Sequence, residues 1–437
     1  MTQGQDVNDS DGLEKFTQDQ LDALVKLHER FLEGRIGGRR ALLKHIDLSG
    51  LDLSRRNLRQ ADFSGCVMRR MDLSDTNFQE AVLYACDISF SNLSNTSFVR
   101  ADMRGTKIES SNLVGADLER ADLRGGALTR DGKYAEPQPV NFRGANLSGA
   151  RLAGTMANNA DFSDAIMARI NVQQADLRGA RLNGADLTGA DLQGVQLAGA
   201  ELKNTILTGT NIDLIKDQVA DISSAITDEN IGPSVSDLAT PLIKLIEEHQ
   251  LWVRTSGTEG RQLDLSDYDL REIGSLKMER LTALKARRAK FFAMNLFKVE
   301  LQSSYLEEAD FRRCDLEEAD FRGSNLQRAK FSHARMARAN FTPLLFTTGQ
   351  NSRFAPCDLS WAEFRYADLT EARLKSANLR YADFSYANLT GADLRDCDFT
   401  GAKLEGALME GADTTGAIFD EDITSSSRAF SLSSLKE

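Results

Sequence analysis

The feature that most constrains this chain is a period of five residues. In residues 183–202, NGADLTGADLQGVQLAGAEL, a leucine recurs at every fifth position, with alanine or valine two positions before it. An α-helix repeats about every 3.6 residues and a strand every two, so this period is typical of neither. We call the leucine position the centre and the position two before it the small position. Residues two apart on an extended chain point to the same side, so both can face inward if the chain turns once per repeat.

Repeats at this spacing run through most of the chain. Centres follow one another through residues 48–128, 142–212, 291–341 and 354–419. Asp, Asn, Gly, Ser and Thr occupy most of the other three positions. These residues satisfy turn backbone groups and tolerate water. The sequence therefore predicts a solenoid with an apolar interior and a polar surface.

The spacing of the phenylalanines indicates how many repeats make one coil. Seven pairs of Phe centres lie four repeats apart, and no pair lies one repeat apart. The pairs are Phe78/Phe98, Phe142/Phe162, Phe291/Phe311, Phe311/Phe331, Phe321/Phe341, Phe364/Phe384 and Phe399/Phe419. A coil of four five-residue sides would stack these rings directly above each other, at about 4.8 Å per coil. We therefore expect a four-sided coil.

The repeats resemble those of the pentapeptide-repeat family, whose motif A-[DN]-L-x-x is seen in residues 185–189, ADLTG. The resemblance covers most of the chain and implies an all-β solenoid fold. It implies two right-handed quadrilateral β-helices, residues 46–214 and 262–420. Residues 271–290 fit the pattern poorly and leave two interpretations open, a distorted coil or a short helix.

A segment with apolar residues at helical spacing precedes each predicted solenoid, residues 18–34 and 236–252. The two segments also match each other, because His28 and His249 stand at equivalent positions and both segments lead into the sequence L-D-L-S. We therefore expect a tandem duplication in which each copy is a short capping α-helix followed by a solenoid. A cap is useful there because the first coil exposes an apolar cross-section and unpaired backbone groups.

The remaining segments complete the predicted domain organisation. Residues 1–45 are the N-terminal tail and first capping helix, residues 215–261 the linker and second capping helix, and residues 421–437 a flexible polar tail. Two slips in the phase of the repeat, at residues 129–139 and 342–353, predict loops extruded from the two solenoids. The slips add nine and eight residues to the regular spacing.

The residues that could carry chemistry are better explained by structure. The four histidines are scattered, and most aspartates are the second residue of the motif. All five cysteines stand at the small position, where Cys is a small apolar filler, and none has the C-x-x-C spacing of a zinc site. These are Cys66, Cys86, Cys314, Cys357 and Cys397. We therefore predict no catalytic residue, no cofactor and no metal site, and a protein that is not an enzyme.

One group of outward residues stands apart from the repeat. Four aromatic residues occupy the last position of their repeats, in two pairs whose members are four repeats apart, with two arginines beside them. Exposed aromatics with Arg are common anchors of protein interfaces. The predicted partner-binding residues are Trp361, Tyr366, Tyr381, Tyr386, Arg365 and Arg380, which the loop residues Leu344, Leu345 and Phe346 extend. A structural role, in which the rings shield turns, is the alternative.

Charge and composition exclude several classes of function. Residues 46–214 carry 21 acidic and 18 basic side chains and residues 262–420 carry 25 and 22, so neither solenoid offers the basic surface of a nucleic-acid-binding protein. No stretch is apolar enough for a membrane span, and the N-terminal sequence lacks a signal peptide, so we expect a cytoplasmic protein. We predict a non-catalytic scaffold or adaptor that binds an unidentified protein partner. Its oligomeric state stays open.

The alternative function belongs to the same family. Quinolone-resistance pentapeptide proteins mimic DNA and bind type II topoisomerases such as DNA gyrase. The nearly neutral solenoids, the tandem duplication and the lack of a helix after Phe419 weigh against this function here.

Overall fold

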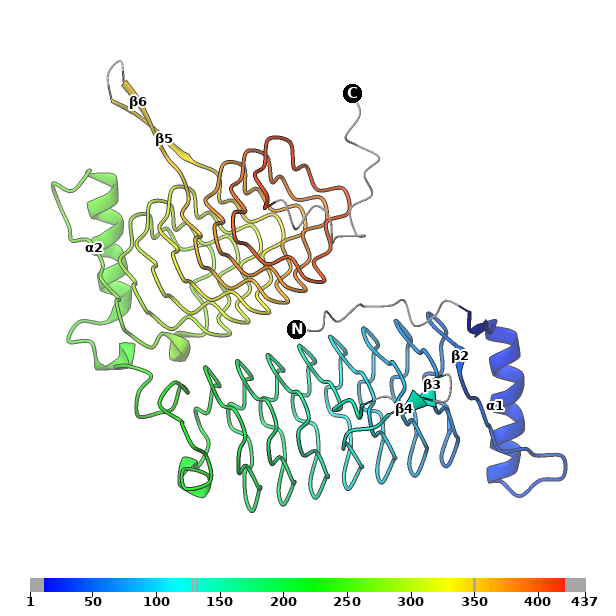
Figure 1. Cartoon of the computed structure of the whole chain (residues 1–437). Coiled ribbons are helices and arrows are strands. Elements are labelled where there is room, and N and C mark those ends of the chain that lie inside the picture. The colour runs from blue at the N-terminus through cyan, green and yellow to red at the C-terminus, as the bar shows by residue number, and fades with distance from the viewer. Residues whose placement is uncertain (1–11, 128, 131–132, 135, 349–350, 421–437) are drawn as a thin grey trace. The chain divides into compact units, whose positions relative to one another are not determined.

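The computed structural model describes residues 12–127, 129–130, 133–134, 136–348 and 351–420 (Figure 1). The chain divides into two compact units, Met1–Asn230 and Ile231–Glu437, which we call the first and second unit. The predicted tail, residues 421–437, lies outside the described residues.

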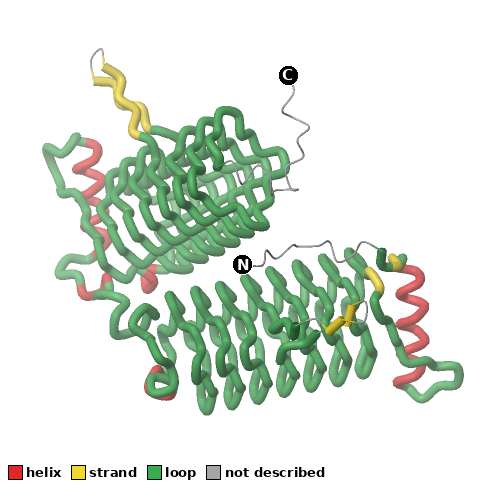
Figure 2. Tube along the Cα trace, in the orientation of Figure 1, coloured by secondary structure: helices red, strands yellow, loops and turns green. Residues whose placement is uncertain are grey.

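Both units consist of coils that each contain four repeats. Parallel bridges join residues four repeats apart along most of each unit, as between Asp52 and Asp72 or between Asp358 and Asn378. Each side of a coil contributes one bridge residue, so nearly all of the tube in Figure 2 is coloured as loop rather than strand. Four five-residue sides per coil are therefore confirmed.

The backbone of one repeat shows how the chain turns. The Leu359 N–H donates to the carbonyl oxygen of Asn378 in the next coil at 2.9 Å, and the Ala362 N–H donates back to the carbonyl oxygen of Leu359 at 3.0 Å. This second bond closes a four-residue turn whose third residue, Trp361, has a φ of 62°. We call this third position the corner. A positive φ at this position favours glycine or asparagine, as in type II turns.

Centres and small positions fill the interior, as predicted. All seven phenylalanine pairs are stacked, with centroids 4.6–5.6 Å apart and planes within 10° of parallel. The five cysteines are buried as free thiols. Cys86, for example, donates its S–H to the carbonyl oxygen of Phe63 in the coil before it. A thiol at the small position therefore satisfies a backbone acceptor while it fills the core.

One helix lies in each predicted helical segment. Helix α1, Gln18–Leu32, begins with a capping box at Thr17. Strand β1, Glu14–Lys15, lies before the helix in the chain and pairs in parallel with strand β2, Ile46–Asp47, which lies after it. Helix α2 is Leu242–Arg254. The predicted start at residue 236 was wrong, because Pro241 disfavours helical geometry in the residue before it. Residues Val235–Asp237 form the 3₁₀ turn η2 instead.

The two helices place their histidines in the same way. His28 and His249 are fully buried, and the Nδ1 atom of each accepts a backbone hydrogen bond of 3.1 Å, from Ala41 and Leu263 respectively. Each imidazole also stacks on the aromatic ring three residues later, Phe31 or Trp252, at 5.9 Å. The matching positions seen in the sequence are thus matching structures.

Both extruded loops are antiparallel hairpins. The first unit carries β3, Thr129–Arg130, paired with β4, Lys133–Tyr134. The second carries β5, Leu344–Thr348, paired with β6, Asn351–Ala355. Figure 1 shows this second hairpin projecting from the coils of its unit. Each hairpin is inserted within a single coil.

The insertions are longer than the phase slips predict. Lys107 bridges Asn141, where a regular coil would pair it with position 127, so the first insertion adds fourteen positions rather than nine. Asn325 bridges Asp358, where a regular coil would pair it with position 345, so the second adds thirteen rather than eight. The reason is that an apolar residue in each loop, Leu128 or Phe354, stands at the spacing of a centre. Phe354 lies in β6 and is 70% exposed, and Leu128 lies outside the described residues.

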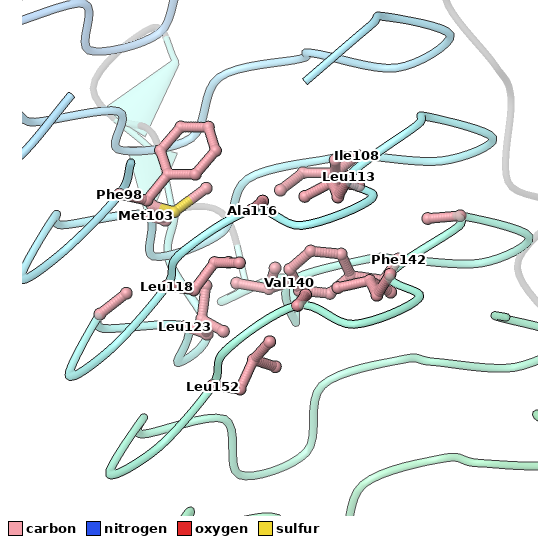
Figure 3. Close-up of a cluster of buried hydrophobic side chains, with 14 of the residues drawn as sticks. Phe98, Met103, Ile108, Leu113, Ala116, Leu118, Leu123, Val140, Phe142 and Leu152 are labelled. Atoms are coloured by element: carbon pink, nitrogen blue, oxygen red, sulfur yellow. The ribbon is translucent and has the colours of Figure 1, made fainter. Parts of the chain in front are cut away.

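The interior continues across the first insertion. Figure 3 shows Leu118 and Leu123 of one coil and Phe142 and Leu152 of the next coil pointing into the same core. All four side chains are fully buried. A hairpin at the edge of a coil therefore leaves the stacking of its neighbours unchanged.

One other segment differs from the sequence-based expectation. Residues 215–230, predicted as linker, belong to the first unit, since Ile215 and Ala225 are buried in its core and Ile226 bridges Ile206. This segment follows the 3₁₀ turn η1, Ile212–Leu214. Apolar side chains without five-residue spacing thus cover the last coils.

The open question about residues 271–290 is answered in favour of a coil. Asp269 bridges Lys290, one position beyond the regular spacing, whereas Ser275 bridges Asn295 at the regular spacing. The extra residue is accommodated in the 3₁₀ turn η3, Arg271–Ile273, which ends at Gly274 with a φ of 69°. The shifted phase in the sequence reflects this single insertion.

Candidate partner-binding surface

Trp361 and Tyr381 form a stacked pair on one corner of the second unit. Their ring centroids are 4.4 Å apart with planes 17° from parallel, and the side chains are 54% and 42% exposed. The backbone N–H of Trp361 donates to the carbonyl oxygen of Arg380, which fixes the two corners one above the other. We call Trp361, Tyr381 and the next corner, Gly401, the Trp361 column.

The neighbouring corner carries a second column of rings. Tyr366 stacks on Tyr386 at 5.1 Å, and His333 stacks on the other face of Tyr366, also at 5.1 Å. His333 and Tyr366 are more than four repeats apart in the sequence because the β5–β6 hairpin lies between them. The Tyr386 hydroxyl lies 3.2 Å from a carboxylate oxygen of Glu405, to which it donates. This Tyr366 column also contains Gly406, the corner that follows.

Glycine at the next corner makes room for the last ring of each column. A Cβ at Gly401 would collide with the ring of Tyr381, and one at Gly406 with the ring of Tyr386. The rings therefore lie along the solenoid axis, flat against the following coil.

The aromatic corners carry a conformational cost. The four Trp and Tyr residues have φ between 59° and 62°. A positive φ is uncommon for residues other than Gly, Asn and Asp, and bulky residues rarely adopt it. Stacking within each column offsets part of this cost. A glycine at each corner would have avoided it entirely.

Each arginine predicted for the site stands one position before an aromatic corner, Arg365 before Tyr366 and Arg380 before Tyr381. The guanidinium of Arg380 is 5.9 Å from the Tyr381 ring centroid and 3.5 Å from the Asp398 carboxylate. Burial alone would raise the pKa of Asp398, but hydrogen bonds from Thr400 and the charge of Arg380 outweigh it, so the pKa is lowered. Arg365 is half-buried, and its carbonyl oxygen accepts from the His333 N–H. Arg380 is thus a fixed positive charge beside exposed rings.

The hairpin residues divide between its two faces. Leu344 and Ala355, which pair with each other, face the coil below, since a Cβ at Gly323 would touch both. Leu345 and Phe354, the next pair, are 52% and 70% exposed. The side chain of Phe346 lies outside the described residues. The exposed apolar pair is therefore Leu345 with Phe354, and the sequence predicted only the first of these.

The structure thus brings together most of the predicted surface and adds to it. His333, Gly401 and Gly406 belong to the columns, yet sequence reasoning missed them. Each glycine stands four repeats after Tyr381 or Tyr386, so that signal was present in the sequence. His333 could not be found because its spacing from Tyr366 depends on the true length of the hairpin between them.

Neither a metal cluster nor a membrane-spanning helix occurs in the part of the chain that the structure describes. There, no group of three or more His, Cys, Asp or Glu side chains is arranged to hold a metal ion. No helix within these residues is long and apolar enough to cross a membrane.

Comparison with known proteins addresses the fold. The family model described as "Pentapeptide repeats" matches eight times, together covering more than half of the chain. The matched residues are 39–75, 52–89, 86–125, 140–174, 173–209, 304–342, 357–396 and 397–421. No curated protein is detectably similar in sequence.

Several solved structures resemble the chain at low identity. HetL, a pentapeptide repeat protein involved in heterocyst differentiation regulation from the cyanobacterium Nostoc sp. strain PCC 7120, is 20% identical over 90% of this chain and 95% of its own, with a TM-score of 0.14. Full-length QnrB1, a plasmid-mediated fluoroquinolone resistance protein, is 14% identical over 89% and 96%, with a TM-score of 0.13. Rfr23 from the cyanobacterium Cyanothece 51142 is 20% identical over 43% and 88%, with a TM-score of 0.10.

Proposed function

Because the chain belongs to the pentapeptide-repeat family, whose members fold as right-handed β-helices, we propose that it is a non-catalytic scaffold that binds a protein partner. The observation that carries this proposal is the Trp361 column, in which two large aromatic side chains stay exposed at corners that favour glycine. The binding surface consists of the two aromatic columns with Arg365 and Arg380 beside them.

The column has the properties of an interface anchor. Trp, Tyr and Arg are enriched among the residues that dominate the binding energy of protein interfaces. Trp and Tyr in particular bury large areas with little loss of side-chain freedom. Stacking of Trp361 on Tyr381 already restricts both rings, so binding costs less conformational entropy. A ring that served only to shield a turn would be covered, and Trp361 is not.

The remaining parts of the protein support this surface. We propose that α1 and α2 cap the first coils, since Leu21 and Val25 of α1 join the core of the first unit and Ile246 of α2 joins that of the second. We place the protein in the cytoplasm, where five buried free thiols are the expected state of cysteine.

The test is a comparison of two variants that each remove exposed aromatic rings. Trp361→Ala/Tyr381→Ala removes the column, and Tyr305→Ala removes a 49% exposed tyrosine elsewhere on the second unit. Tagged wild-type protein and both variants are used for affinity purification from the native host, with quantitative mass spectrometry. A partner retained by wild type and Tyr305→Ala and lost by the double variant supports the proposal. We expect the double variant to bind the purified partner at least about tenfold more weakly.

A result that contradicts the proposal is equal capture by all three proteins at equal thermal stability. The nearly balanced charge of each solenoid, in which acidic side chains exceed basic ones by only three, weighs against the DNA-mimic function. Dose-dependent inhibition of DNA gyrase supercoiling by the purified protein would nevertheless replace the scaffold proposal.

A further inference from the structure

The β5–β6 hairpin presents two unpaired strand edges. It is a two-stranded sheet in which β5 pairs with β6 over five residues, and no other strand of the described residues joins it. An isolated two-stranded hairpin is marginally stable in water, and free edges pair readily with another strand. A hairpin of this length is therefore incomplete as a sheet.

The hairpin of the first unit differs from the β5–β6 hairpin in the length of its strands and in how its base is held. Its strands are two residues long. Its base is held by Tyr84, whose hydroxyl donates to the carbonyl oxygen of Ala127 at 2.7 Å and accepts from the Ala127 N–H at 2.8 Å. Very short strands are one of the ways in which proteins prevent edge-to-edge association. The second hairpin lacks this protection.

The composition of the two strands distinguishes their edges. Strand β5 reads LLFTT and contains no charged residue and no proline, whereas β6 reads NSRFA with Arg353 at its middle. Antiparallel pairing of a strand with a second copy of itself places the middle residues opposite each other. Charged residues in an edge strand are one of the ways in which proteins discourage pairing with a second copy, and β6 contains one whereas β5 contains none. Strand β5 therefore lacks this form of protection.

The register shows which groups of β5 are available. The register pairs Thr348 with Asn351, with two residues between them in the chain. Hairpins with a two-residue connection close on a hydrogen-bonded pair, and from this rule we infer that hydrogen-bonded and non-bonded pairs alternate along β5. Leu345 and Thr347 belong to non-bonded pairs. Their N–H and C=O groups consequently point away from β6, toward the open edge.

We propose that the protein forms a two-fold symmetric dimer through β5, which pairs antiparallel with β5 of a second copy around Phe346. The N–H of Thr347 in each copy then donates to the carbonyl oxygen of Leu345 in the other, and the two hairpins become one four-stranded sheet. Two-fold closure limits the assembly to a dimer. Leu345 and Phe354, exposed on one face of each hairpin, form a continuous apolar surface across it.

The interface is small, which predicts how the dimer behaves. Strands of five residues bury less than a standard protein interface, so the dimer is weak and forms in the micromolar range. Sedimentation velocity over a concentration series is suited to this range. The full-length protein is expected to move from the mass of one chain, 48.2 kDa, toward twice that mass.

Proline at one position on each edge tests the strand assignment. Thr347→Pro removes an N–H that points outward from β5, and Ser352→Pro removes the equivalent N–H on β6, while both leave the hydrogen bonds between β5 and β6 intact. We expect Thr347→Pro to weaken the dimer at least about tenfold and Ser352→Pro to leave it within about twofold of wild type. Leu345→Lys places a charge at the same edge on a half-exposed side chain and gives a second measure that does not rely on proline.

Each outcome decides the proposal. A wild-type chain that stays monomeric throughout the series overturns it, as does a dimer unaffected by both Thr347→Pro and Leu345→Lys. A dimer lost in Ser352→Pro alone assigns the interface to β6 and also overturns it. Trp361→Ala/Tyr381→Ala is expected to dimerise normally, so failure of the dimer and failure of the partner site can be told apart.

Discussion

The two units follow the same pattern of inward residues and differ at their corners. In the first solenoid, 13 glycines adopt positive φ at or near corners, and in the second only seven do. Charged side chains occupy corners in both units, but four Trp and Tyr corners lie in the second unit, whereas Phe90 is the one Phe, Tyr or Trp corner among the described residues of the first. The comparison teaches that inward positions specify the coil, while corners can change without altering it. Columns of stacked rings can therefore be present on the corners of one copy while both copies keep the same pattern of inward residues.

The largest expected effect tests whether the two interiors are independent. Leu187→Asp and Leu389→Asp each put a carboxylate at a centre that is at most 2% exposed. Each should lower the free energy of unfolding of its own unit by more than about 4 kcal/mol. Hydrogen exchange followed by mass spectrometry should show lost protection in residues 46–214 for the first variant and in residues 262–420 for the second. Lost protection in both units from either variant would show a single cooperative structure.

The next largest effect is the loss of stability when one buried aromatic ring is removed from each core. Phe331 contacts four other rings, Phe311, Phe321, Phe341 and Phe364. Phe142 stacks on Phe162. We expect Phe331→Ala and Phe142→Ala to cost about 3–5 kcal/mol each, with Phe331→Ala at the upper end because it breaks more aromatic pairs. Urea unfolding of the two variants measures this difference, and equal costs would mean that ring stacking adds nothing beyond burial.

A smaller effect is expected at the corners themselves. Gly401 and Gly411 have nearly the same φ, 71° and 68°, but only Gly401 lies under a ring. Gly411→Ala should cost about 1 kcal/mol from backbone strain alone. Gly401→Ala should cost more and should also change the fluorescence of Trp361, since the new methyl group displaces Tyr381. The same spectrum for both alanine variants would show that the ring does not rest on Gly401.

The smallest expected effect is a pH dependence of stability that arises from the equivalent histidines of the two units, His28 and His249. Desolvation by burial lowers the pKa of His28 and of His249 below 6.5. The unfolded chain therefore binds protons at a higher pH than the folded chain, and stability falls as the pH drops below about 6.5. We expect Tm to decrease from pH 7 to pH 5, and the decrease to be smaller in His28→Gln/His249→Gln. A pH dependence that the double variant retains in full would assign it to other groups.

The sequence predicts the repeating parts of this fold well, because every repeat restates the same constraint. Seven phenylalanine pairs at a spacing of four repeats were sufficient to predict four sides per coil, and the structure confirms all seven stacks. Insertions are different, because spacing alone does not separate an inward residue from an exposed one. Phe354 stands at a suitable distance from the next centre and yet is exposed on a hairpin.

The candidate surface could be predicted where it follows the repeat and not where it depends on an insertion. The aromatic pairs follow from the four-repeat spacing, and their stacking is confirmed at 4.4 and 5.1 Å. His333 joins them only through the coil that holds the second hairpin, whose length depends on where that hairpin begins and ends. Residues 215–230 were also missed, since apolar residues that cover the end of a solenoid do not follow its period.

The two insertions carry a consequence for how such chains diversify. A coil can take in a whole hairpin while the bridges above and below keep their partners. The length of a segment inserted at a corner thus does not affect the packing of the other coils, so one inserted segment can be replaced by another without changes elsewhere in the solenoid. The position of the second hairpin is therefore suited to the insertion of other peptides, and the distance between two inserted peptides could be chosen in steps of one coil.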